Sequence, residues 1–119
     1  TLEPAENVTA KINRELFEWV LENLVKNGLD AMEDGKGRIS FHLSRFNGAP
    51  VIDITDTGKG IDVAYRKDIF RPGFSTKKRG WGLGLSLSKR IIETYHKGKL
   101  TVKESKIGVG TTFRIKLRG

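Results

Sequence analysis

The chain has 119 residues, a length typical of one domain and too short for two independent hydrophobic cores. Its 37% hydrophobic and 30% charged residues exclude an intrinsically disordered chain, and the absence of cysteine excludes disulfides and cysteine-ligated metal centres. The net charge is +8, but the basic residues are scattered rather than interleaved with aromatic residues along a strand pair. We therefore expect a single domain over residues 1–119 that does not bind nucleic acid.

The first third of the chain predicts a short strand and a long helix. Val8, Ala10 and Ile12 alternate with polar residues, as in a strand, and residues 15–33 then repeat apolar side chains at helical spacing. The stripe expected to face the core is Leu16, Val20, Leu24 and Ala31. The run Asp34-Gly35-Lys36-Gly37 is typical of a segment that ends a helix.

Next the sequence predicts a β-hairpin. Ile39, Phe41 and Leu43 alternate with polar residues, Asn47-Gly48 is a turn dipeptide, and residues 51–55 return as a second strand. A glycine-rich stretch over residues 56–84 then breaks all periodicity, and loops of this length in compact domains are usually functional.

The last third predicts a helix over residues 85–95 and two strands over residues 99–103 and 111–117. Together the elements predict an α+β two-layer sandwich, in which helices cover one face of a mixed, mostly antiparallel sheet of about five strands.

Two asparagines mark the long helix as a candidate binding element. Asn23 and Asn27 are four residues apart, so their amides project from the same edge of the helix. Amide oxygens suit Mg²⁺ and add no negative charge beside a polyphosphate. A pair of asparagines bonded to neighbouring loops explains the pattern equally well.

A second candidate is Asp56, which follows a predicted strand and precedes Gly58 and Gly60. A carboxylate at a strand end accepts a hydrogen bond from the amino group of adenine, whereas guanine presents an acceptor there. Asp-x-Gly is also a common turn, and most such stretches are only turns.

A glycine cluster precedes the second helix. The run Gly80-Trp81-Gly82-Leu83-Gly84-Leu85 would place free backbone N–H groups and a helix N-terminus beside a phosphate, although it matches neither the P-loop nor the dinucleotide fingerprint. Phe70 and Phe74 should anchor the loop before it to the domain. His42 and His96 have no nearby partners and are expected to be solvated or capping residues rather than metal ligands.

In this order, the motifs resemble the catalytic ATP-binding domain of sensor histidine kinases, which has the Bergerat fold. Residues 22–31 resemble the asparagine box, residues 56–61 the first glycine box and residues 68–77 the phenylalanine box. Residues 82–87 and 108–113 resemble the remaining glycine boxes. Departures are Gly28 in place of alanine, Asp30-Ala31 in place of lysine and an aromatic residue, and Gly73 in place of an aromatic residue.

The resemblance implies a nucleotide site for ATP and Mg²⁺. Asn27 would coordinate the metal, Asn23 would help to hold the ion or the phosphates, and Asp56 would bind the adenine amino group. The other implied contacts are Gly58, Gly60 and Ile61 near the base, Lys77 as a cation of the ATP lid, Gly82, Leu83, Gly84 and Leu85 near the phosphates, and Thr111 beside Asp56.

Asn23 also indicates the reaction class. ATPases of this fold carry a glutamate base at that position, and Glu22 would point about 100° away around the helix. No catalytic residue is assigned, and transfer of the γ-phosphoryl group to a histidine is favoured over ATP hydrolysis. The alternatives are an ATP-dependent switch without catalysis, a Bergerat-type ATPase and a nucleic-acid module.

The acceptor histidine would lie on a separate dimerisation domain of the same kinase, and a response regulator would receive the phosphoryl group from it. The resemblance implies that the isolated domain is monomeric and cytoplasmic, in a full-length kinase that is either soluble or membrane-anchored. No apolar run reaches the roughly 20 residues that a membrane helix needs.

Overall fold

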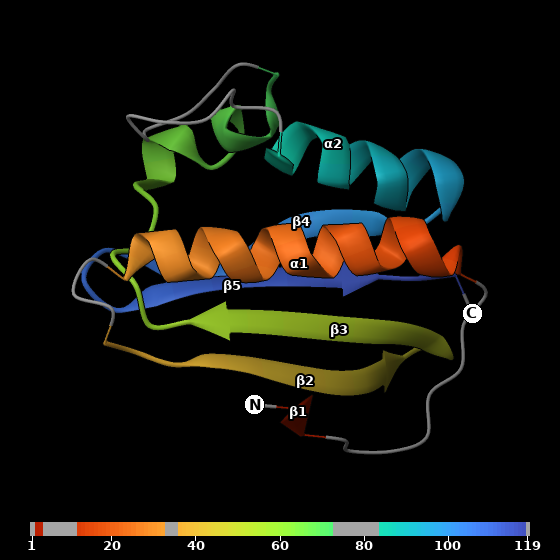
Figure 1. The fold of residues 1–119 in the computed structure, drawn as a ribbon, viewed down its shortest axis with the longest axis horizontal. Coiled ribbons are helices and arrows are strands. Elements are labelled where there is room, and N and C mark those ends of the chain that lie inside the picture. The colour runs from red at the N-terminus through yellow and green to blue at the C-terminus, as the bar shows by residue number, and fades with distance from the viewer. Residues whose placement is uncertain (1, 4–11, 33–35, 73–83, 119) are drawn as a thin grey trace.

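The computed structural model describes residues 2–3, 12–32, 36–72 and 84–118, and it forms two layers (Figure 1). One layer is a five-stranded sheet with the strand order β1-β2-β3-β5-β4. The strands are β1 (Leu2–Glu3), β2 (Ile39–Phe46), β3 (Ala49–Asp56), β4 (Lys99–Lys106) and β5 (Gly110–Lys116). The other layer contains α1 (Arg14–Ala31) and α2 (Gly84–Arg90), which continues as the π-helical turn η3 (Ile91–Tyr95). The predicted two-layer α+β sandwich is therefore confirmed.

Strand pairing in the sheet is antiparallel except at one edge. β2, β3, β5 and β4 pair antiparallel, whereas the two residues of β1 pair parallel with Phe41 and His42 of β2. The strand expected around residues 8–12 is not β1: Val8 and Ala10 lie outside the described residues, and Ile12 is not in a strand. The hairpin turn is as predicted, because Asn47 and Gly48 both have positive φ, 51° and 81°.

The helix α1 starts at a side-chain cap and packs through one stripe. The Oδ1 atom of Asn13 accepts a hydrogen bond from the N–H of Leu16 at 3.1 Å, which satisfies one of the free donors of the first turn. Val20 and Leu24 are buried as expected, and Phe17, which the pattern did not include, is buried with them. The core between the layers consists of Phe17, Val20, Leu24, Ile52, Ile54, Ile69, Ile91, Ile92, Leu100, Phe113, Ile115 and Leu117.

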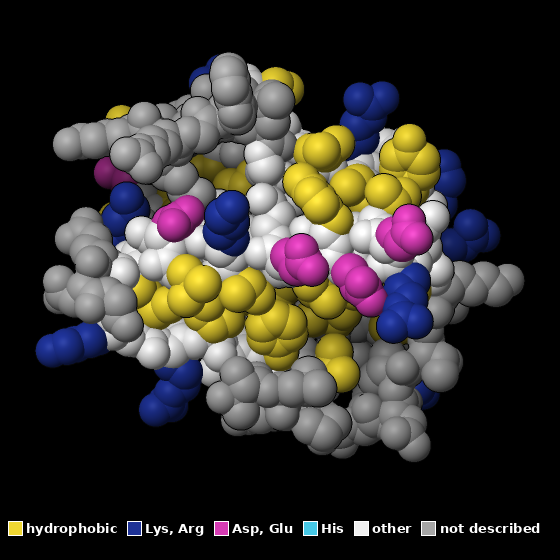
Figure 2. Space-filling model, in the orientation of Figure 1, with side chains coloured by type: hydrophobic (Ala, Val, Ile, Leu, Met, Phe, Trp, Pro, Cys, Tyr) yellow, Lys and Arg dark blue, Asp and Glu magenta, His cyan; other side chains and the backbone are white. Residues whose placement is uncertain are grey.

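The outer stripe of α1 is charged. Glu15, Glu18 and Glu22 are exposed, and Figure 2 shows charged side chains along this helix with apolar side chains on both sides of it. Among the described residues, no helix has the length and apolar character needed to span a membrane.

Two short 3-10 turns follow β3 on the helical side of the domain, η1 (Val63–Tyr65) and η2 (Asp68–Phe70). Phe70 packs on the core with its ring edge-on to that of Phe113, with 6.3 Å between the ring centroids. The Nζ atom of Lys89 in α2 lies 4.8 Å from the Phe70 ring centroid. Phe70 therefore anchors this segment as expected, whereas Phe74 lies outside the described residues.

Candidate functional site

Asp56 ends β3 at the edge of the core and is 7% exposed. Its Oδ1 atom accepts a hydrogen bond from the N–H of Gly58 at 2.8 Å, and the backbone N–H of Thr111 also donates to its carboxylate. Burial raises the pKa of Asp56, and these two hydrogen bonds offset the shift only in part. The carboxylate therefore retains the capacity to accept a hydrogen bond from a ligand.

Gly28 brings α1 against this strand end. A Cβ atom at Gly28 would lie 3.2 Å from the Cβ of Asp56 and 3.1 Å from the Cδ1 of Ile39, closer than ordinary packing allows. The glycine at a position where alanine was expected thus lets the helix turn that carries Asn27 lie directly beside Asp56. The helix edge and the strand-end acid are brought to the same end of the domain.

Gly58 and Gly60, which follow Asp56, are required because other parts of the chain pack closely against their Cα atoms. A Cβ atom at Gly58 would lie 2.6 Å from the Cβ of Ala31 at the end of α1. Gly60 has a φ of 80°, and a Cβ there would clash with the backbone carbonyl of Lys106. These approaches shape the loop that carries Ile61, whose side chain packs partly buried against the core.

Asn23 lies where α1 packs against α2. Its Nδ2 atom donates a hydrogen bond to the Oγ of Ser88, which is fully buried, at 3.0 Å. A Cβ atom at Gly84 would lie 2.7 Å from the Oδ1 of Asn23, so the absence of a side chain at Gly84 leaves this oxygen room at the start of α2. Asn27 lies one turn further along α1 and is partly buried.

Ser88 was not predicted from the sequence. The two serines of α2, Ser86 and Ser88, form no recognisable sequence pattern. The burial of Ser88 follows only from the packing of α2 on α1. Its spacing of four residues from Gly84 is the single feature that places both on one edge of the helix.

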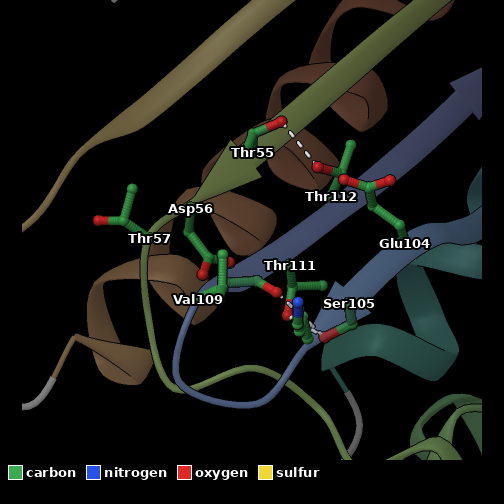
Figure 3. A pocket seen from close by; sticks show the side chains of 10 residues that line it. Thr55, Asp56, Thr57, Glu104, Ser105, Val109, Thr111 and Thr112 are labelled. Carbon is green, nitrogen blue, oxygen red and sulfur yellow. Dashed lines mark hydrogen bonds between the residues drawn. The ribbon is translucent and has the colours of Figure 1, made fainter.

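A pocket of about 400 Å³ opens at the Asp56 end of the sheet (Figure 3). Its lining contains Asp56, Ser105 and Thr111, which lie on the helical side of the sheet, and also Thr55 and Thr112, whose hydroxyls are bonded to each other at 2.9 Å. Thr55 precedes Asp56 in β3, and Thr112 follows Thr111 in β5. Because successive side chains of a strand alternate between its faces, Thr55 and Thr112 point to the face opposite the helices. Only the helical-side set belongs to the candidate site.

The remaining predicted contacts fall into two groups. Leu85 packs partly buried against the core, and Thr111 is 5% exposed beside Asp56. Lys77, Gly82 and Leu83 lie outside the described residues.

The histidines have different environments, and neither belongs to a metal cluster. His42 is exposed on β2, whereas His96 is 6% exposed and caps two helices. Its Nε2 atom accepts from the N–H of Asn13 at 2.9 Å, and its Nδ1 donates to the carbonyl of Ile91 at 3.0 Å. Within the described part of the chain, no three His, Cys, Asp or Glu side chains gather where they could hold a metal ion.

The amide oxygens nevertheless fit a hard cation that is held partly by the protein and partly by the oxygens of a polyphosphate. Asn23 and Asn27 place two amide side chains on the α1 edge, and the absence of a side chain at Gly84 leaves the Oδ1 of Asn23 uncovered by a Cβ atom there. Mg²⁺ usually takes one or two protein oxygens and completes its shell with phosphates and water, so a full protein cage is not required.

The comparisons with known proteins identify the family of the chain. The profile of the family described as "Histidine kinase-, DNA gyrase B-, and HSP90-like ATPase" matches residues 12–119. The chain belongs to this family, and within it the chain is of the sensor histidine kinase type.

Two relatives of known function are sensor proteins. The sequence is 40% identical over 113 residues to the signal transduction histidine-protein kinase AtoS of Escherichia coli, covering 92% of this chain and 18% of that protein. It is 37% identical over 108 residues to the C4-dicarboxylate transport sensor protein DctS of Rhodobacter capsulatus, covering 88% of this chain and 16% of that protein. The chain thus spans less than a fifth of the length of these relatives.

Solved structures of histidine kinases share the fold. The nucleotide-free catalytic domain of histidine kinase ThkA is 31% identical with a TM-score of 0.78, covering 91% of this chain and 70% of that one. The mycobacterial sensor histidine kinase MprB is 25% identical with a TM-score of 0.79, covering 91% of this chain and 75% of that one. The predicted fold class and family are therefore both confirmed.

Proposed function

We propose that this chain binds ATP with Mg²⁺ and donates the γ-phosphoryl group to a histidine on a separate dimerisation domain of the same kinase. The observation that carries the proposal is the buried, partly satisfied carboxylate of Asp56 beside the α1 turn that bears Asn27. A carboxylate suits the adenine amino group, and the amide oxygens along the neighbouring α1 edge suit a magnesium ion bound to the phosphates.

In this proposal, Asp56 accepts a hydrogen bond from the adenine amino group. Asn27, assisted by Asn23, would hold a magnesium ion, which neutralises phosphate charge when bound. The first residue of α2, Gly84, lies against the side chain of Asn23, and the free backbone N–H groups of a helix start favour an anion. Gly58, Gly60, Ile61, Leu85 and Thr111 shape the ends of the site, and Lys77, Gly82 and Leu83 are proposed to complete it.

The chain's own contribution to catalysis would be alignment and charge neutralisation rather than acid–base chemistry. The amide of Asn23 is bonded to Ser88 and cannot act as a general base, and Glu22 is exposed on the outer stripe of α1. This arrangement favours transfer to a histidine, which is itself a nucleophile, over activation of water.

The direct test mixes the 119-residue chain with a helical hairpin fragment that carries an acceptor histidine, in the presence of γ-labelled ATP and Mg²⁺. We expect acid-labile, base-stable label on the hairpin and slow release of free phosphate. ATP binding without transfer to an acceptor would support the non-catalytic switch instead, and rapid release of phosphate by the chain alone would support the ATPase.

Asn27→Ala is the matched site variant, with Glu22→Ala as its control on the exposed stripe of the same helix. We expect Asn27→Ala to reduce ATP affinity strongly with Mg²⁺ and only weakly with a chelator, as calorimetry can measure. Equal losses under both conditions would contradict a role at the metal.

A further inference from the structure

β4 is an edge strand, because it stands at the end of the sheet order and pairs with β5 on one side. An edge strand presents a row of backbone N–H and C=O groups with which another extended chain can pair. In an antiparallel pair, every second residue turns both of these groups away from its partner strand. The outer row of β4 therefore needs partners that β5 does not supply.

Leu100 in this outer row has both backbone groups bonded to one ion pair. Its N–H donates to the Oε2 of Glu93 at 3.3 Å, and its carbonyl accepts from the Nζ of Lys89 at 3.1 Å. The two side chains are four residues apart on the helix formed by α2 and η3, and they bond to each other at 2.9 Å. Leu100 thus meets one acceptor and one donor, as it would beside the backbone of another strand.

Packing holds the Lys89–Glu93 pair at the edge of the sheet. The Lys89 Nζ lies 4.8 Å from the ring centroid of Phe70, which itself packs on the core. The two side chains are 36% and 34% exposed, whereas those of Arg14 and Glu18, a pair with the same spacing on α1, are 88% and 56% exposed. The Lys89–Glu93 pair is therefore part of the packed domain, and not an ordinary surface pair.

Other features protect the rest of the β4 edge. A bulge between Val102 and Glu104 interrupts the regular ladder, and beyond it the carbonyl of Ser105 accepts from the Nη2 of Arg66 at 2.6 Å. Three exposed lysines would repel a second copy of the strand, and they are Lys99, Lys103 and Lys106. Salt screens this repulsion between exposed charges, but it screens partly buried bonds such as those to Leu100 much less.

We propose that the Lys89–Glu93 pair closes the edge of β4 at Leu100, and that it thereby prevents strand addition by a second copy of this chain. The pair takes the place that the backbone of the added strand would occupy. Its contribution is separable from that of the lysines, because it persists at high ionic strength. This inference does not depend on nucleotide binding.

The test removes both side chains in the variant Lys89→Ala with Glu93→Ala, and it measures molar mass by sedimentation at about 1 M salt, where the Debye length is about 3 Å. We expect the mass of the variant to rise with protein concentration, and the unmodified chain to keep the mass of one chain. At low concentration the Leu100 amide of the variant should exchange with deuterium about 3- to 10-fold faster, the factor expected for one lost hydrogen bond. Association should slow this exchange again.

The matched control is Arg14→Ala with Glu18→Ala, which removes a pair of the same spacing away from the sheet edge. It should keep the mass of one chain and leave the exchange of Leu100 unchanged, and Lys89→Arg, which keeps the charge and the donor, should behave like the unmodified chain. A folded double variant that stays a single chain at high salt overturns the inference, as does association that leaves Leu100 unprotected. If the double variant does not fold, Glu93→Ala alone removes the acceptor of the Leu100 N–H, and the same two measurements decide.

Discussion

Asp53 and Asp56 lie on the same strand, β3, point to opposite faces of the sheet, and have pKa values shifted in opposite directions. Burial raises the pKa of Asp53, but the hydrogen bonds and charge of Arg114, helped by Lys103, lower it overall. The two bonds from Arg114 are 2.8 and 2.9 Å long. Burial raises the pKa of Asp56, and no cation among the described residues lowers it. Asp53 is paired with a cation within the sheet, whereas Asp56 is the acid that we propose binds a ligand.

Asp56→Asn should weaken ATP binding and stabilise the ligand-free chain. Loss of a charged hydrogen bond to the adenine amino group should cost about 1–3 kcal/mol of binding free energy, measurable by calorimetry. Without nucleotide, the variant avoids the cost of a buried carboxylate, so its melting temperature near neutral pH should be higher. Unchanged ATP affinity would place the adenine pocket elsewhere.

The pH dependence of this stabilisation follows from the raised pKa. Between the ordinary value of 3.8 and the higher folded value, the folded state binds more protons than the unfolded state, so stability falls as pH rises through this window. The advantage of Asp56→Asn should therefore be largest above the window and vanish below 3.8, in thermal denaturation without nucleotide.

Asp53→Asn should have the opposite effect on stability. Because the folded pKa lies below 3.8, Asp53 stabilises the fold at pH values above 3.8, and this contribution disappears as pH falls through the folded pKa. We expect a loss of about 1 kcal/mol near neutral pH, small because the Arg114 side chain is partly exposed and the pair is screened by solvent. Urea denaturation measures the loss, and ATP affinity serves as the control because it should not change.

Gly60→Ala and Gly48→Ala form a matched pair. Both glycines have nearly the same positive φ, 80° and 81°, but a Cβ at Gly60 would clash with the Lys106 carbonyl, whereas Gly48 has open space around it. Gly48→Ala should cost about 1 kcal/mol of unfolding free energy for the backbone conformation alone. Gly60→Ala should cost clearly more, and equal costs would mean that the loop before Ile61 moves freely away from β4.

Gly84→Ala should separate binding from stability. The new Cβ would meet the amide of Asn23, which is the end of a flexible side chain and can move. Because Gly84 is the first residue of α2, alanine gains less there than the roughly 1 kcal/mol of a helix interior, and we expect the melting temperature to change little. Nucleotide affinity should fall because the Asn23 oxygen is displaced, and a variant with unchanged affinity would argue against Asn23 in the site.

The prediction of the fold from the sequence succeeded where periodicity was strong. The helices and the four antiparallel strands were predicted close to their observed bounds, because each has an apolar face that must be buried. β1 was not predicted, since its two residues have no periodicity of their own and are defined only by pairing with β2.

The residues of the candidate site can be selected from the sequence where they belong to a motif, but not where they are single residues. Asn23, Asn27 and Asp56 stood out because amides on an apolar helix and an acid before glycines are unusual choices. Ser88 and Ser105 are ordinary residues in their own segments, and only their contacts with Asn23 and Thr111 place them at the candidate site.

The sequence by itself determined the order of the elements, the family and the chemistry available, because side-chain type and spacing are local properties of the chain. The tertiary structure alone decided that Gly28 lets α1 lie against Asp56, that Ser105 connects β4, β5 and the segment at Ile61, and that two acids of one strand acquire opposite pKa shifts. These properties depend on burial and on contacts between residues far apart in the chain, which no local pattern specifies.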